Sequence, residues 1–496
     1  MASGIVGVLT LSRRAFLGGL ACTAAGLALG ACTSDGRAVP ATTRSRPDPA
    51  TRRRVVVVGA GLAGLVAAAD LRAAGWDLEV LEARERVGGR VLTLRDQFTD
   101  GLHAEGGGES IDDNHDRIQA RLAQHGLRTE RRSTARDRAI VFRRGRRQTA
   151  AAFVARRSGR VGRDYARYYE AVARLADGVD PDHPDRTVRA EYLDAHSLAD
   201  LLDHLALTPE ARFLVEAAET SEYNFEARDI SLLFLAQQEA VVAEVPDSAA
   251  ETMRVHGGNG LLPAALATAL GDDLHLGRPV TAVEHRGEGV RVTAGGAPVE
   301  AAHLVLAVPP PTLSQIEFDP PLPADVAAMV AGLALGPTTK VVTQYEHSFW
   351  RDQGLSGLTV SDLAFDLTWD AADSYDAGPA GMLTAFTTGD EGAALSGLSD
   401  DARIRKVQAG VDRVYPGSQR LTSGHAATTA WAREAFTGGA YACFRPGQVI
   451  AFWPTLRAPL GPIRFAGEHT EALAGYMESA VRSGERVALD IGAPPP

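Results

Sequence analysis

Gly59, Gly61 and Gly64 stand at the spacing G-x-G-x-x-G, directly after the valine run 55–58. In this pattern the first glycine allows a sharp turn, the second lets the backbone approach a pyrophosphate, and the third allows close packing of helix on strand. Glu82 ends the next apolar run, about 20 residues further on. A carboxylate at this point accepts hydrogen bonds from a ribose diol, so the stretch predicts a dinucleotide site.

A second glycine-rich loop follows Glu82 and contains Gly88, Gly89 and Arg90. One interpretation is a Gly-Gly turn followed by a solvated arginine. Coming so soon after the first motif, the loop instead resembles that of the FAD-binding flavoprotein oxidoreductases, where it continues around the cofactor diphosphate. The resemblance implies that the dinucleotide is FAD.

Composition excludes several other classes of protein. A chain of 496 residues predicts about two domains, and a formal net charge of −11 argues against nucleic acid as the main partner. The three cysteines cannot form a disulfide framework or a C-x-x-C metal pair. No H-E-x-x-H sequence occurs, and no metal site is expected.

The first 32 residues have the features of a targeting segment, which does not contribute to the fold. Arg13 and Arg14 form a twin-arginine pattern before a weakly apolar run, 15–31, which is too short to span a membrane comfortably. We expect export through the Tat translocase to the periplasmic or extracellular face of the cell membrane. Cys32 ends a lipobox-like sequence and is the expected lipid anchor; the alternative is a simple cleaved signal. Residues 33–52 indicate a disordered linker.

Patterning places the remaining elements around these motifs. Strands are predicted at 55–58, 78–81, 280–285, 289–293, 302–308, 338–345 and 463–465, and helices at 65–74, 261–270 and 475–489. The stretch 136–250 reads as helical, without strong strand alternation. We interpret it as a helical insertion into a second domain.

Taken together, the chain resembles the flavin-containing amine oxidase family, which includes monoamine, polyamine and putrescine oxidases and L-amino-acid oxidases. The resemblance runs in order along nearly the whole chain after the targeting segment. It rests on VVVVGAGLAGLVAA, LEARERVGGR, VHGGNGLLPAAL, AHLVLAVPPPTL, TTKVVTQYEHSFW, WAREAFTGGAYACFRPG and FAGEHTEALAGYMESAVRSGERVA.

The resemblance implies a combined α/β and α+β fold. A Rossmann-like FAD-binding domain of the glutathione-reductase type would be interleaved with a substrate domain of mixed sheet and helices. The expected boundaries give the FAD-binding domain residues 53–135, 251–315 and 436–492. The substrate domain would contain 136–250, with its helical insertion, and 316–435.

For the cofactor, the resemblance implies a set of contacts spread over the chain. Some relatives attach FAD through a cysteine at the position of Ala440, so here the FAD should be bound non-covalently; Cys443 is not expected to substitute. The expected FAD-binding residues are Gly59, Gly61, Ala63, Gly64, Glu82, Ala83, Gly89, Arg90, Gly107, Gly108, Val280, Gly467, Glu468 and Met477.

For the reaction, the resemblance implies that Lys340 binds a water near flavin N5, with a surface lysine as the alternative. Tyr441 and Tyr476 would form an aromatic cage for the amine, with Trp431 in its wall. The expected chemistry is hydride transfer from a neutral amine to the flavin. The imine then hydrolyses to aldehyde and ammonia, and dioxygen is reduced to hydrogen peroxide.

Glu109 bears on the substrate class. Amino-acid oxidases place an arginine for the substrate carboxylate in the turn that here reads GGGESI. Glu109 in this turn would repel a carboxylate and attract a distal ammonium, which favours amines, including diamines. An L-amino-acid oxidase, a desaturase-like flavoenzyme and a non-catalytic FAD-binding lipoprotein remain alternatives. The sequence leaves the oligomeric state open, with a homodimer as the candidate.

Overall fold

The computed structural model describes residues 53–132, 138–156, 159–243, 252–287 and 289–494. The predicted targeting segment, the linker 33–52 and Cys32 lie outside the described residues. Within these ranges, no helix combines the length and the apolar character that crossing a membrane requires.

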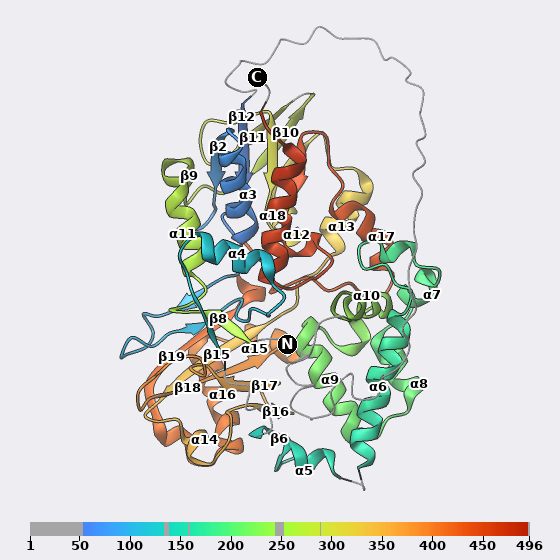
Figure 1. Ribbon diagram of the computed structural model, residues 1–496, viewed down its shortest axis with the longest axis vertical. Helices are drawn as coiled ribbons and strands as arrows, with labels where there is room; N and C mark the ends of the chain where they lie inside the picture. The colour runs from blue at the N-terminus through green and yellow to red at the C-terminus, as the bar shows by residue number, and fades with distance from the viewer. Residues whose placement is uncertain (1–52, 133–137, 157–158, 244–251, 288, 495–496) are drawn as a thin grey trace.

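A five-stranded parallel sheet forms the upper part of the molecule (Figure 1). The valines of its central strand are almost completely buried, as expected for a strand covered on both faces. The helices α3 and α18 lie side by side against this sheet. In spatial order the strands are β20 (Ile463–Phe465), β13 (His303–Leu306), β1 (Arg54–Val58), β2 (Asp77–Leu81) and β9 (Leu274–His275); the helices span Leu62–Ala73 and Met477–Ile491.

A smaller four-stranded sheet adjoins it. It contains β12 (Val299–Ala301), β11 (Gly289–Thr293), β10 (Ala282–Arg286) and β14 (Glu317–Asp319). Because β14 pairs in parallel with β10, this sheet extends past the boundary predicted at residue 315. The proline run 309–311 begins the short helix α12 (Pro310–Leu313), since proline is well tolerated in a first helical turn.

A seven-stranded sheet lies in the lower part of Figure 1. All seven residues of β15 are buried, which fits its position between two strands and under α16 (Asp400–Val414). In order, the strands are β19 (Thr422–Ala430), β15 (Thr339–Tyr345), β18 (Gly381–Thr387), β17 (Leu367–Asp370), β16 (Thr359–Ser361), β6 (Ile140–Arg143) and β7 (Arg146–Thr149).

The hairpin β6–β7 is an exception to the helical interpretation of 136–250. Ile140, Val141 and Phe142 are all buried, so β6 has no apolar–polar alternation, and β7 is an arginine-rich edge strand. A short strand buried on both faces has no period-2 signal.

The rest of that stretch is helical as predicted and forms the bundle on the right of Figure 1. Its central helix is α6 (Arg160–Ala176). Two further helices pack against α6: α9 (Pro209–Tyr223) and α10 (Leu232–Val242). The remaining α-helices are α4 (Asp116–Gln124), α5 (Ala150–Val154), α7 (Ala190–Asp194), α8 (Leu198–Leu205), α11 (Leu261–Leu270), α13 (Ala324–Gly332), α14 (Phe349–Asp352), α15 (Gly389–Ser396) and α17 (Gln448–Leu456).

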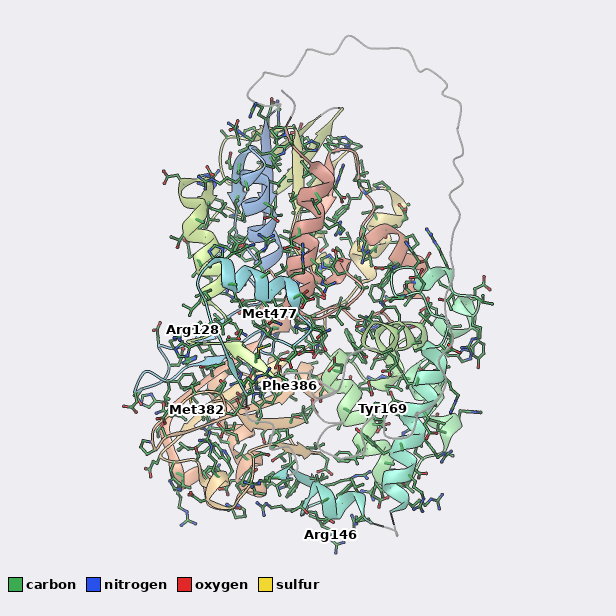
Figure 2. All side chains as sticks on the ribbon, in the orientation of Figure 1. Arg128, Arg146, Tyr169, Met382, Phe386 and Met477 are labelled. Carbon is green, nitrogen blue, oxygen red and sulfur yellow. The ribbon has the colours of Figure 1, made fainter. Side chains whose placement is uncertain are left out.

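Two small antiparallel ribbons lie outside the large sheets. The strands β3 (Thr93–Leu94) and β4 (Ala104–Glu105) pair with each other, and β5 (Thr129–Arg131) pairs with β8 (Met253–Val255). Figure 2 labels Met477 at the start of α18 and Phe386 in β18, which lie where the upper and lower parts of the molecule meet. Both residues line the cavity described next.

Candidate active site

A single continuous cavity runs from the first glycine motif to the seven-stranded sheet and the helix α9. Among the predicted site residues that the structure describes, all but Gly64 line it. Those residues are Gly59, Gly61, Ala63, Glu82, Ala83, Gly89, Arg90, Gly107, Gly108, Glu109, Val280, Lys340, Trp431, Tyr441, Gly467, Glu468, Tyr476 and Met477. Segments up to about 400 residues apart in the chain are thus brought to one site.

The two glycines around the start of α3 have different surroundings, which test whether a dinucleotide fits. A Cβ atom at Gly64 would overlap the Gly59 carbonyl oxygen, so this glycine is required for packing of α3 against the turn. A Cβ atom at Gly61 would meet no other atom within 4 Å and would project into the cavity. The open space beside Gly61, at a helix N-terminus, is what a pyrophosphate requires.

Glu82 stabilises the same turn. Its Oε2 accepts a hydrogen bond from the Ala60 amide at 2.7 Å, and its Oε1 accepts one from the Arg84 amide at 2.9 Å. A carboxylate has about four acceptor positions, so acceptor capacity remains for ribose hydroxyls. The geometry therefore fits the predicted role, and together with the glycine surroundings it shows that these residues suit FAD.

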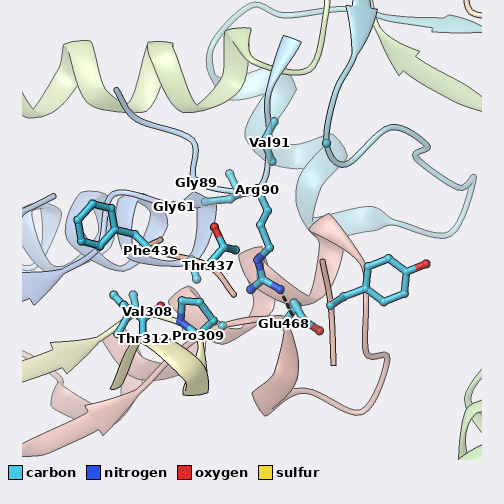
Figure 3. Close-up of a pocket in the computed structure, with 18 of the residues that line it drawn as sticks. Gly61, Gly89, Arg90, Val91, Val308, Pro309, Thr312, Phe436, Thr437 and Glu468 are labelled. Carbon is cyan, nitrogen blue, oxygen red and sulfur yellow. Dashed lines mark hydrogen bonds and ion pairs between the residues drawn. The ribbon is translucent and has the colours of Figure 1, made fainter. Parts of the chain in front are cut away.

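Glu468 lines the cavity and contacts three other segments of the chain; its ion pair with Arg90 is the dashed line in Figure 3. Its Oε1 pairs with Arg90 Nη1 at 2.7 Å and accepts the Ala442 amide at 3.3 Å, while its Oε2 accepts the Gly475 amide at 2.8 Å. Arg90 also donates to the Ala440 carbonyl at 2.7 Å. Glu468 therefore positions the two loops that carry Tyr441 and Tyr476, in addition to lining the predicted cofactor site.

The two predicted cage tyrosines both reach α9. The Tyr441 hydroxyl donates to the Ser221 carbonyl oxygen at 3.2 Å, and the Tyr476 hydroxyl donates to Glu222 Oε1 at 2.9 Å. Gly475 allows the two loops to approach, since its φ is +86° and a Cβ there would lie 2.9 Å from the Tyr441 ring. Consecutive residues of one helix thus position both rings at the cavity.

Trp431 lies on another side of the cavity, directly after β19. It is buried, and its indole Nε1 donates to the Gly106 carbonyl oxygen at 3.0 Å. Ala440 also lines the cavity, at the position where some relatives carry the attaching cysteine. Cys443 is completely buried, and burial raises the pKa of its thiol well above the usual value.

Lys340, in β15, is buried and donates to Glu109 Oε2 at 2.7 Å. The other Glu109 oxygen accepts from Arg254, in β8, and from the Trp369 indole at 2.8 Å. The ammonium that Glu109 contacts in this structure is therefore that of Lys340. The predicted attraction of Glu109 for a substrate ammonium stays a prediction, and so does the water predicted beside Lys340.

Burial alone would raise the pKa of Glu109, but the charges of Lys340 and Arg254 outweigh it and lower the pKa to about 2. Glu109 is thus an anion throughout the neutral range. Nearby Glu105 has the opposite environment: burial raises its pKa to about 7, against hydrogen bonds from Asn259 and Thr93. Two neighbouring carboxyl groups therefore have widely separated pKa values, a pattern typical of functional sites.

Sequence reasoning did not find Glu222, Arg254 or Trp369. Glu222 lies in a helix with no motif, and only the fold brings it to Tyr476. Arg254 directly precedes the quoted segment VHGGNG, and it meets Glu109 because the chain at Ile111 bridges to Met253. Spacing along the chain contains no signal for such contacts.

Comparison with known proteins is consistent with this geometry. The family model described as flavin containing amine oxidoreductase matches residues 62–492. The Mycobacterium tuberculosis (strain H37Rv) protein AofH, which carries the name of a flavin-containing monoamine oxidase, is 32% identical over 460 residues, 91% of this chain and 99% of that protein. The L-amino acid dehydrogenase of Synechocystis sp. is 27% identical over 465 residues, 89% of this chain and 95% of that one. A solved structure of wild-type putrescine oxidase bound to putrescine superposes with a TM-score of 0.79 at 30% identity, covering 88% of this chain and 98% of that one.

Proposed function

Because the chain belongs to the family of flavin-containing amine oxidoreductases, we propose that it selects cationic amines without a carboxylate. The family membership makes it an FAD-dependent enzyme that acts on amines. The observation that carries the proposal is the pairing of Tyr476 with Glu222 at the cavity, next to Tyr441 and Ser221. Aromatic faces beside a carboxylate are the surroundings that an ammonium group prefers.

The chain's own residues bind and orient the amine. The rings of Tyr441 and Tyr476 line the cavity, and hydrogen bonds to α9 fix both hydroxyls. Glu222 attracts the ammonium form of the amine, and releasing its proton leaves the nitrogen lone pair that the oxidation requires. When bound, FAD takes two electrons from the amine and passes them to dioxygen, giving hydrogen peroxide.

The same residues disfavour amino acids. An α-carboxylate between the tyrosines would lie near the Glu222 carboxylate and would be repelled. Two cationic side chains at the cavity could in principle bind a substrate carboxylate, but both are already in ion pairs: Arg90 with Glu468 and Lys340 with Glu109. The similarity to an L-amino acid dehydrogenase keeps amino acids as the second candidate substrate class.

Anaerobic mixing of the purified yellow protein with a panel of amines and a panel of L-amino acids tests the proposal. We expect amines to bleach the flavin, and we expect peroxide when air is readmitted. Bleaching by amino acids alone would contradict the proposed role of Glu222. Bleaching by neither panel would contradict the proposed substrate class.

We further propose that the enzyme is exported by the Tat translocase and anchored through a lipid on Cys32. The support is the twin-arginine pattern at Arg13 and Arg14 and the lipobox-like sequence before Cys32. Replacing both arginines with lysine should retain the protein in the cytoplasm, and Cys32→Ala should release it from the membrane fraction. An unchanged distribution of both variants would contradict the proposal. A homodimer stays a prediction that light scattering can check.

A further inference from the structure

A buried cluster of charges lies where the cofactor cavity meets the seven-stranded sheet. The side chains of Lys340, Glu109, Arg254 and Asp373 are 3%, 4%, 6% and 10% exposed. They alternate in sign: Lys340 contacts Glu109, Glu109 contacts Arg254, and Arg254 contacts Asp373 at 3.1 Å. Removing Glu109 would leave the Lys340 ammonium buried without its carboxylate partner.

The surroundings of Lys340 Nζ fit an ammonium ion. The nitrogen lies 2.7 Å from Glu109 Oε2, 3.0 Å from the Gly107 carbonyl oxygen and 3.2 Å from the Glu105 carbonyl oxygen. An ammonium group has three N–H donors and no acceptor, so each donor has one oxygen. A neutral amine would direct its lone pair at one of these oxygens, which is unfavourable.

Glu109 is itself fixed in position. Arg254 and the Trp369 indole donate to its Oε1, which leaves Oε2 directed at Lys340. Arg254 in turn donates to the Ala371 carbonyl oxygen at 2.6 Å. The Trp369 ring centroid lies 5.3 Å from Lys340 Nζ, within the range of a cation–π contact that favours the charged form of the lysine.

From this geometry we infer that Glu109 is a positioning residue that keeps Lys340 a cation, so that the flavin end of the cavity carries a fixed positive charge across the neutral range. All three N–H groups of Lys340 then bind protein oxygens. The predicted contact of Lys340 with a water would have to replace one of these hydrogen bonds. The inference rests on the proposed binding of FAD in this cavity.

Other charged groups face this pair, and the test has to separate them. Glu105 is the one whose pKa, raised by burial to about 7, places its titration in the same range. The groups that act on Lys340, Glu109 or Arg254 from the neighbouring elements are Glu105, Arg132, Asp373 and Tyr375. A Glu105→Gln background removes the first of these titrations.

The experiment measures the flavin midpoint potential against pH, between about pH 6 and pH 9, where a buried lysine that loses its counter-ion can titrate. Four holoenzymes are compared in the Glu105→Gln background: the parent, Glu109→Gln, Lys340→Met and the double variant Glu109→Gln/Lys340→Met. Flavin absorbance first shows that each protein binds FAD, which separates a failure of this inference from a failure of the proposed function.

We expect the potential of the parent to exceed that of Lys340→Met by a constant amount at every pH, because a nearby cation stabilises the reduced, anionic flavin. Glu109→Gln should exceed the double variant at the acidic end only. The difference should shrink several-fold as pH rises, because Lys340 without Glu109 loses its proton. Glu109→Asp should restore the behaviour of the parent.

Three results would overturn the inference. A constant difference between Glu109→Gln and the double variant would show that Lys340 stays charged without Glu109. A difference between the parent and Lys340→Met that closes with rising pH would show that Lys340 titrates in the presence of Glu109. No difference at any pH would show that its charge does not reach the flavin. If Glu109→Gln does not fold, the comparison of the parent with Lys340→Met still tests whether Lys340 keeps its charge over this pH range.

Discussion

At the scale of single residues, the contact between Tyr476 and Glu222 makes a direct prediction about substrate binding. Glu222→Gln keeps the size of the side chain and a hydrogen-bond acceptor but removes the charge. We expect the KM for a cationic amine to rise about tenfold, corresponding to about 1.4 kcal/mol, with a smaller change in kcat. Steady-state oxygen consumption with one good amine measures both constants.

Glu216 provides the matched control, because it lies on the same helix α9 and pairs with Arg212 away from the cavity. Glu216→Gln removes the same charge and should leave KM unchanged. An equal rise in both variants would mean that the general charge of α9, and not Glu222, acts on the substrate. L-amino acids should become better substrates of Glu222→Gln relative to amines, because the repulsion of their carboxylate is removed.

At the scale of elements, the turn between β1 and α3 allows packing and cofactor binding to be separated. Gly64→Ala should destabilise the apoprotein by about 1–3 kcal/mol, since its methyl group would overlap the Gly59 carbonyl oxygen. Gly61→Ala should leave the stability of the apoprotein nearly unchanged, because its methyl group meets no protein atom. It should instead weaken FAD binding.

Urea unfolding of both apoproteins and fluorescence titration with FAD check this pair of predictions. The φ of Gly61 is −71°, which alanine adopts without strain, so a loss of affinity in Gly61→Ala reports occupied space and not a distorted backbone. Normal FAD affinity in Gly61→Ala would contradict the placement of the diphosphate beside this residue.

Elements with strong local signals could be predicted from the sequence. Helix 261–270 and strand 289–293 agree residue for residue with α11 and β11. The strand 338–345 differs from β15 by one residue at its start. Strand β6 was missed because burial on both faces removes the alternation that marks a strand, and β7 was missed because its arginine-rich sequence has no apolar face.

Some residues of the candidate site could likewise be predicted from the sequence, and others could not. Residues in family motifs, such as Tyr441 and Tyr476, could be named from the sequence because the motif carries the position. Their partners Ser221 and Glu222 could not, because these contacts depend on how the helical bundle packs against the rest of the fold. The contact of Lys340 with Glu109 depends likewise on a separation of 231 residues along the chain.

At the scale of the whole molecule, buried titratable groups predict how stability depends on pH. Burial lowers the pKa of His115 to about 3 and that of His469 to about 4. Their contribution to stability is therefore full above about pH 6.5 and is lost as pH falls from there through the folded-state pKa values, because the unfolded chain binds these protons first. Burial raises the pKa of Glu105 and Asp366 to about 7, so their contribution is full at acidic pH and is lost as pH rises through 7.

Between about pH 4.5 and 6.5 the two histidines and the two carboxyl groups change the free energy of unfolding in opposite directions, so their effects largely cancel. The cationic neighbours of Glu109 lower its pKa to about 2, against the effect of burial. Below about pH 4.5 the unfolded chain therefore protonates Glu109 first, and this loss of stability adds to the loss from the histidines. We therefore expect the free energy of unfolding to be nearly constant from about pH 5 to 6.5 and to fall steeply below about pH 4.5. Urea unfolding of the FAD-saturated protein over this range measures it, and maximum stability at pH 4 would contradict the assignment.

The order of strands in the five-stranded sheet has a consequence for biosynthesis. The sheet places β20, which begins at Ile463, directly beside β13 and one strand away from β1, and α18 covers α3 near the start of the described chain (Figure 1). The ribosome must therefore synthesise the segments Ile463–Phe465 and Met477–Ile491 before this sheet and its covering helices can close. A chain that stops before Ile463 retains β1, β2, β9 and β13 but lacks β20, Glu468 and α18, so it cannot complete the cofactor cavity.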